Sequence, residues 1–106
     1  MITTLGHKIL ENLEDLAQLE VLNNGKPIWE ARLDIQSCVD CFLYFGGIAP
    51  TISGTHIQLP SNSFGLVKRE PLGVVGAIGA WNYPLQTCSW KVGYGTKTTC
   101  GYEYKP

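Results

Sequence analysis

The segment from Pro71 to Trp90 contains no charged residue, and this feature constrains the fold more than any other. Its length would suffice to cross a bilayer, but it also contains three glycines, an interior proline and several polar side chains. Leu72–Ala80 is almost wholly apolar, which is typical of a strand buried on both faces of a parallel sheet. Pro84 predicts a helix that begins there and extends to Lys91. We therefore expect a buried strand, a turn and a helix, and no membrane span.

Two helices are expected before this segment. In residues 2–22 the apolar side chains recur at spacings of three and four, which predicts one helix. The Asn-Asn-Gly at residues 23–25 ends it, because Asn and Gly tolerate the left-handed conformation. Pro27 fits the first turn of a second helix. Two glycines and a proline end that helix between residues 46 and 52, so this region predicts a helical hairpin.

The pattern changes to short strands after the helices. Thr55–Leu59 and Phe64–Arg69 are β-prone and are separated by Pro-Ser-Asn-Ser, which predicts a β-hairpin. Helices, a hairpin and then a strand–turn–helix form an α/β arrangement with a single βα unit. Residues 92–106 contain three glycines and three tyrosines without a helical period. We therefore divide the chain into one region of residues 1–91, which follows these patterns, and residues 92–106, which we expect to form a divergent, irregular tail.

Composition excludes several classes of function. The net charge is −1 and the basic residues are scattered, so the chain lacks the basic stripe of a nucleic-acid-binding protein. Charged residues make up 16% of the sequence, below the usual ~25%, which favours a chain that packs against more protein. The first residues mix charges among apolar positions, unlike a secretory signal. We therefore expect reduced cysteines and a cytoplasmic location.

Asn82 is the first candidate for chemistry. It follows the apolar strand, and ligands of open α/β sheets bind at the carboxyl ends of the strands. A side-chain amide beside a helix N-terminus can stabilise an oxyanion, and removal of one such donor typically costs about 3–4 kcal/mol of transition-state stabilisation. A simpler interpretation makes Asn82 the N-cap of the helix and Trp81 a core residue. Both interpretations stay open at this point.

The cysteines suggest a weaker alternative. Cys38 and Cys41 form a C-x-x-C, but they lie within a helical pattern. A zinc site would need a turn and a second well-spaced pair, which Cys88 and Cys100 do not supply, so we expect no metal. A redox protein with this motif would contain a thiol of low pKa.

A family resemblance extends over several separate blocks. The stretch EPLGVVGAIGAWNYPL strongly resembles the aldehyde dehydrogenase superfamily, whose members carry a P-L-G-V strand followed by W-N-[FY]-P. Two upstream blocks are similar to the family's helix connection, and two more resemble its betaine-aldehyde (4-trimethylaminobutyraldehyde) type. The resemblance covers roughly residues 8 to 91. The blocks are residues 70–85, residues 22–27 and 30–32, and residues 56–60 and 69–71.

The resemblance implies a truncated amino-terminal part of the aldehyde dehydrogenase fold and assigns roles to four residues. Asn82 resembles the oxyanion-hole amide that stabilises the charge on the aldehyde oxygen. Ile78 and Trp81 resemble positions that line the NAD site. Lys105, followed by proline, resembles the lysine that contacts the adenosine ribose of NAD.

The resemblance also implies a reaction that this chain cannot complete. In the family a cysteine thiolate attacks the aldehyde, hydride passes to NAD, and water releases the acid. The segments with the nucleophilic cysteine and the basic glutamate are absent from these 106 residues, so we expect a fragment that is inactive alone. The alternative is a non-catalytic assembly module, a homo-oligomer or a partner of full-length subunits, which associates through the hairpin of residues 55–69.

Overall fold

The structure, a computed structural model, describes residues 1–96 and 101–105, and the side chains of residues 1–95. It is an α/β fold, as predicted. The elements in chain order are α1 (Ile2–Glu11), α2 (Leu13–Asn24), α3 (Ile28–Ile48), a 3₁₀ turn (Ala49–Thr51), β1 (Thr55–Gln58), β2 (Phe64–Val67), β3 (Val74–Ile78), α4 (Pro84–Thr96) and β4 (Gly101–Lys105).

The first helical region is divided in two, whereas the sequence predicted one helix over residues 2–22. Asn12 leaves the helical conformation, with φ −111° and ψ 21°. Its side-chain amide donates to the carbonyl of Lys8 at 2.8 Å, and its backbone N–H donates to Ile9 at 3.2 Å. Asparagine competes in this way with the regular helix hydrogen bonds. The prediction of a single helix was therefore wrong at Asn12.

The connection between α2 and α3 confirms the predicted helical hairpin. Gly25 has φ 77° and ψ 12°, the left-handed conformation that closes a helix, and its N–H donates to Val21 at 2.8 Å. Pro27 is the N-cap of α3, so the helix begins one residue later than predicted. α3 ends at Ile48, within the predicted range of residues 46–52.

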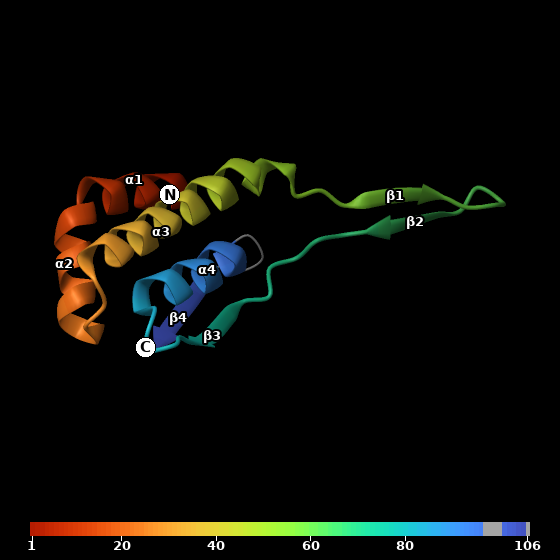
Figure 1. Cartoon of the computed structure of the whole chain (residues 1–106). Coiled ribbons are helices and arrows are strands. Elements are labelled where there is room, and N and C mark those ends of the chain that lie inside the picture. The colour runs from red at the N-terminus through yellow and green to blue at the C-terminus, as the bar shows by residue number, and fades with distance from the viewer. Residues whose placement is uncertain (97–100, 106) are drawn as a thin grey trace.

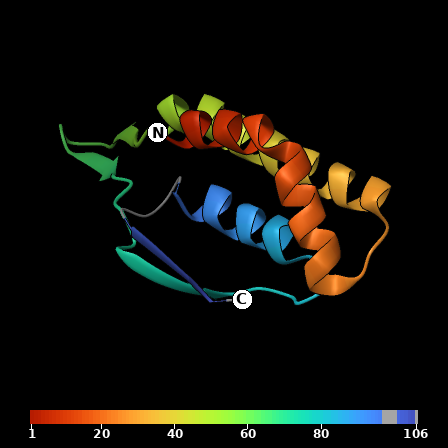
Figure 2. The same cartoon turned by 90° about the vertical axis from the view of Figure 1, so that its left-hand side faces the viewer.

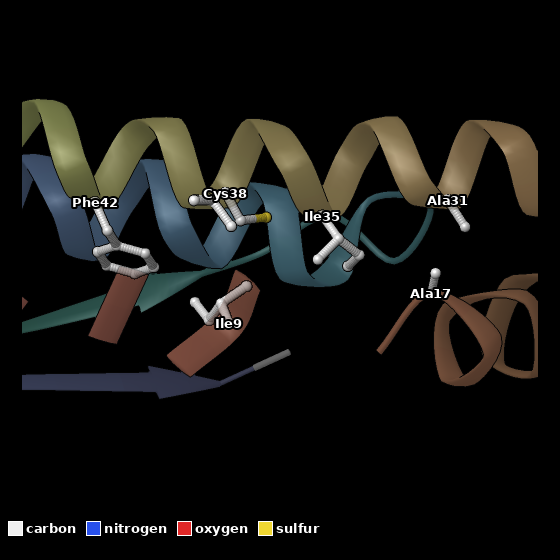
Figure 3. Close-up of a cluster of buried hydrophobic side chains, with 7 residues drawn as sticks. Ile9, Ala17, Ala31, Ile35, Cys38 and Phe42 are labelled. Atoms are coloured by element: carbon white, nitrogen blue, oxygen red, sulfur yellow. The ribbon is translucent and has the colours of Figure 1, made fainter. Parts of the chain in front are cut away.

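The buried core lies around α3, the longest helix (Figure 1). This helix contacts α1, α2 and α4 along its length. Figure 3 shows side chains of α1 and α2 pointing toward the same face of α3. The buried apolar residues are Ile9 from α1, Ala17 from α2, and Ala31, Ile35, Cys38, Val39 and Phe42 from α3.

The predicted β-hairpin forms but lies apart from this core. β1 and β2 pair antiparallel, with His56 opposite Leu66. Ser61 and Asn62 turn the chain in the left-handed region, at φ 61° and 58°. In Figure 1 the hairpin extends away from the helices, and the whole chain spans 65 × 23 × 18 Å. All residues of β1 are exposed.

β3, α4 and β4 form a βαβ unit (Figure 2), in place of the single βα unit expected from the sequence. β3 and β4 are parallel neighbours, with Val74 opposite Gly101. The prediction that residues 92–106 are irregular is therefore wrong for residues 92–96, which continue α4, and for β4. The glycines and the missing helical period of residues 92–106 predicted an irregular tail, whereas Gly93 lets α4 lie close against Cys41 and Phe45 of α3.

The apolar side chains of β3 are more exposed than the sequence predicted. Val74 and Ile78 are each 79% exposed. α4 lies against the sheet on one side in Figure 2, and no described element of this chain covers the opposite side. Separately, none of the helices in residues 1–96 is both long and apolar enough to cross a membrane.

Candidate functional site

The turn between β3 and α4 places Asn82 at the carboxyl end of β3. The first hydrogen bond of α4 runs from the N–H of Thr87 to the carbonyl of Tyr83, at 2.9 Å. Tyr83 is therefore the N-cap residue and Asn82 precedes it, so the interpretation of Asn82 as the N-cap is wrong. Asn82 is exposed, and its side-chain amide makes no hydrogen bond within the part of the chain that the structure describes. The amide is thus free to face a ligand.

The residues predicted to bind the cofactor gather at the same edge of the sheet. Ile78 and Lys105 are the last residues of β3 and β4, and they are register partners. Trp81 follows three residues after Ile78 and is 81% exposed, so the alternative that it is a core residue is wrong. The position of the Lys105 side chain lies outside the described side chains. This edge combines parallel strand ends, exposed apolar surface and a helix N-terminus, and ligands of open α/β sheets bind at edges of this kind.

The connection between α2 and α3 lies directly against this turn, which the sequence did not predict. The side-chain amide of Asn24 donates to the backbone carbonyl of Asn82 at 3.2 Å. Its carbonyl oxygen Oδ1 accepts the backbone N–H of Lys26 at 3.1 Å. One side chain therefore links the end of α2 to the residue that precedes the N-cap of α4.

Lys26 forms a buried ionic cluster beneath the turn. Its side chain is 8% exposed, and Nζ lies 2.5 Å from Asp34 Oδ2 and 3.3 Å from Glu20 Oε1. Nζ also lies 4.0 Å from the centroid of the Tyr83 ring, in cation–π contact. Burial alone would lower the pKa of Lys26, but the hydrogen bonds and charges of Asp34 and Glu20 outweigh it and raise this pKa. The cluster therefore holds a protonated lysine against the aromatic ring.

The start of α4 is fixed to α3 by two further contacts. The Tyr83 hydroxyl donates to Glu30 Oε1 at 3.0 Å, and this bond and the charge of Glu30 raise the pKa of the phenol. The Gln86 amide donates to Asp34 Oδ1 at 3.4 Å. The contacts around the turn join two blocks of the sequence, residues 24–34 and residues 81–86, and spacing alone could not place the two blocks together.

A hollow of about 160 Å³ opens between the two blocks. Its walls combine polar side chains of the α2–α3 connection and of α3 with the aromatic residues of the turn. The residues that line it are Asn24, Lys26, Glu30, Trp81, Asn82 and Tyr83.

The C-x-x-C motif lies inside the helical layer and is not a reactive pair. Cys38 Sγ donates to the carbonyl of Asp34 at 3.1 Å, and burial raises its pKa to about 11. Cys41 Sγ donates to the carbonyl of Ser89 at 3.3 Å, and burial raises its pKa as well. The redox alternative required a thiol of low pKa, so it is wrong for these two residues. Among the described residues no group of three metal-ligating side chains occurs, and Cys100 lies outside them.

Sequence comparison assigns this chain to a known family. The whole chain, residues 1–106, matches the sequence profile described as aldehyde dehydrogenase family. The chain belongs to the aldehyde dehydrogenase family. It is 53% identical over 83 residues to 4-trimethylaminobutyraldehyde dehydrogenase of Mus musculus, covering 78% of this chain and 17% of that protein. The human protein of that name is 54% identical over 83 residues, with the same coverage. The aldehyde dehydrogenase chain thus spans 17% of the length of these relatives.

Solved structures of the aldehyde dehydrogenase family have the same fold. A double mutant of betaine aldehyde dehydrogenase from Staphylococcus aureus, in complex with NAD⁺, superposes with a TM-score of 0.94 at 37% identity. The match covers 99% of this chain and 21% of that one. A mutant aldehyde dehydrogenase from Bacillus cereus gives a TM-score of 0.94 at 40% identity, covering 99% of this chain and 22% of that one. The matched fold therefore includes residues beyond Lys91.

Proposed function

We propose that this chain supplies the amino-terminal part of an NAD-dependent aldehyde dehydrogenase, in which Asn82 stabilises the negative charge on the aldehyde oxygen. The observation that carries the proposal is the exposed Asn82 amide at the carboxyl end of β3, one residue before the N-cap Tyr83. The sequence identity of 53% to a 4-trimethylaminobutyraldehyde dehydrogenase supports the same assignment.

Asn82 acts by electrostatics and not by proton transfer. When a nucleophile adds to an aldehyde, the carbonyl oxygen gains negative charge. The Asn82 amide donates an N–H to this oxygen, and the positive end of the α4 dipole favours the same charge. Pro84 at the first position of α4 has no N–H, so the side-chain amide of Asn82 supplies a donor where the backbone of Pro84 cannot.

The nucleophile comes from another segment. Cys38, Cys41 and Cys88 all have a raised pKa because they are partly or fully buried. A thiol must be deprotonated to attack an aldehyde at neutral pH. None of these three described thiols is therefore suited to attack an aldehyde, and we propose that the chain contributes one side of a catalytic site and does not oxidise aldehydes alone.

NAD is the cofactor that this edge of the sheet would hold. Ile78 and Trp81 would supply the apolar wall that excludes water, and Lys105 would lie beside the ribose. When bound, NAD accepts the hydride that leaves the aldehyde carbon.

The free state of three described cysteines agrees with a reducing, cytoplasmic location.

The substrate class that we propose is a trimethylammonium aldehyde, and NADH formation tests it. The endogenous product is captured with an antibody against residues 56–70, and its intact mass is measured first. It is then assayed with NAD and either 4-trimethylaminobutyraldehyde or butanal, which lacks the cationic head. We expect a product several times heavier than 11.7 kDa and a higher kcat/KM for the cationic aldehyde. A heavy product without NADH formation from either aldehyde would refute the proposed activity, and equal kcat/KM would refute the substrate class.

A second candidate function is assembly, and the hairpin favours it. The hairpin exposes several large apolar side chains, and within the described residues the outer edges of β1 and β2 pair with no other strand. Unpaired apolar edges recruit other chains. The exposed side chains are Ile57, Leu59, Phe64, Leu66 and Val67.

Sedimentation of the 106-residue chain tests this second function. We expect association of the native chain and of the control Leu19→Lys, whose residue is exposed on α2, but monomers of Leu66→Lys. A native chain that stays monomeric at all concentrations, or a Leu66→Lys variant that still associates, would rule out assembly through the hairpin.

A further inference from the structure

The turn between β3 and α4 that carries Asn82 is called the catalytic turn below. A hydrogen bond joins it to the α2–α3 connection, between Asn24 and Asn82, which are 58 residues apart in the sequence. We propose that Asn24 and Lys26 are positioning residues that fix the backbone of Asn82 and thereby aim its side-chain amide at the reacting oxygen. This inference rests on the proposed function, and it names which residues orient the donor.

Asn24 is suited to this task because both ends of its amide are engaged. Oδ1 accepts the Lys26 N–H at 3.1 Å, and Nδ2 donates to the Asn82 carbonyl at 3.2 Å. The first bond fixes the rotation of the amide group, so the second bond has a fixed direction. The carbonyl of Asn82 is thus held at a set distance from the end of α2.

Lys26 restrains Tyr83, the residue that follows Asn82. Its ammonium group lies between two carboxylates, on Glu20 of α2 and Asp34 of α3, and 4.0 Å from the centroid of the Tyr83 ring. Removal of one partner from a buried ion cluster leaves an uncompensated charge, so the lysine resists displacement. The ring of Tyr83 cannot move without breaking this contact and the bond of its hydroxyl to Glu30.

The side chain of Asn82 has no such support of its own. Within the described residues it makes no hydrogen bond, and it is exposed. Its direction is therefore set by the backbone at residue 82, which Asn24 holds on one side and Tyr83 on the other. Trp81, one residue earlier, is 81% exposed, and within the described part of the chain its side chain has no hydrogen bond or ion pair. Loss of the Asn24 bond should therefore affect the oxyanion donor more than the apolar wall of the cofactor site.

Asn24→Asp is the variant that isolates this bond. It keeps the Oδ1 acceptor for Lys26 and removes the N–H donor to Asn82. Asn23→Asp is the matched control, because Asn23 is the exposed neighbour and receives the same added charge. In ¹H–¹⁵N spectra of the 106-residue chain, we expect Asn24→Asp to shift the backbone and side-chain amide signals of Asn82, with an unfolding midpoint close to that of Asn23→Asp. Unchanged Asn82 signals, or equal shifts in both variants, would overturn the proposal.

Kinetics of the endogenous dehydrogenase provide the second readout. We expect Asn24→Asp to lower kcat about fivefold, the effect of one misplaced hydrogen bond, while the KM for NAD stays near that of Asn23→Asp. A purely structural role would lower the amount of folded enzyme and leave kcat per folded site unchanged, and this result would overturn the proposal. If wild-type enzyme forms no NADH, the proposed function fails, whereas the spectra of the 106-residue chain still decide whether Asn24 positions Asn82.

Discussion

Apolar side chains of α3 and of the strands β2 and β3 differ in how far they are buried. Ile35 of α3 is fully buried, whereas Ile78 of β3 is 79% exposed. Phe42 of α3 is 4% exposed, whereas Phe64 of β2 is 58% exposed. The helices bury a set of apolar side chains against one another within this chain, whereas no large apolar side chain of β1, β2 or β3 is buried. Large apolar surfaces of this kind mark contacts with other protein or with ligands.

The catalytic turn lies on the boundary between these two regions. Asn24 and Lys26 hold Asn82 and Tyr83 from the helical side. On the other side the turn continues the exposed end of β3. Under the proposed function, the helical layer would position the oxyanion donor, and the exposed strand edge would face NAD and the nucleophile.

The largest expected effect is the difference in the free energy of unfolding between Phe42→Ala and Phe64→Ala. Phe42→Ala should lower the free energy of unfolding by about 3–5 kcal/mol, because it removes a buried ring from the core. Phe64→Ala should lower it by less than about 0.5 kcal/mol, because the ring is mostly exposed. Urea unfolding followed by circular dichroism at the helical signal measures both. Equal losses would show that the hairpin belongs to the same cooperative core and would break the comparison.

A medium effect is expected at Gly93 of α4. A Cβ there would lie 2.9 Å from Cys41 Sγ and 3.1 Å from the Phe45 ring. Gly93→Ala should therefore lower the stability by about 1–3 kcal/mol, as overpacking does. The control Gly47→Ala meets no atom within 4 Å in α3 and should be neutral or stabilising. A neutral Gly93→Ala variant would mean that α4 does not pack on α3 beyond Lys91.

The smallest effect is a pH dependence of the helical layer. Burial raises the pKa of Cys38 from 9.0 to about 11, so the folded state holds this proton more tightly than the unfolded state. The stabilisation is complete below pH 9 and is lost as the pH rises toward 11, about 1 kcal/mol of it by pH 10. Urea unfolding at pH 8 and pH 10 should show a smaller loss for Cys38→Ala than for the native chain. An identical loss of stability in the variant and the native chain would contradict the raised pKa of Cys38.

The sequence predicted the helices, the hairpin and the strand–turn–helix because each depends on local signals. Gly25 closes α2 and Pro50 follows the end of α3, as their backbone preferences dictate. The break at Asn12 was missed because it depends on a side-chain hydrogen bond within a regular apolar pattern. The end of α4 was missed because Gly93 serves packing there instead of ending the helix.

The site was predicted less completely than the fold. Asn82, Ile78 and Trp81 were found from a single contiguous block, and the pairing of β3 with β4 adds Lys105 to the same edge. Asn24 and Lys26 were missed as site residues because their contacts with the turn depend on tertiary packing. Likewise, the apolar run of β3 predicted a buried strand but could not reveal that Val74 and Ile78 are exposed among the described residues.

The most direct test of the central claim is the kcat of the endogenous dehydrogenase with Asn82→Ala, measured beside Asn23→Ala. We predict that Asn82→Ala lowers kcat about 100- to 1,000-fold, as loss of one oxyanion donor does, while the KM for NAD changes little and Asn23→Ala behaves as the native enzyme. A kcat that is unchanged in Asn82→Ala would contradict the claim that this turn stabilises the oxyanion.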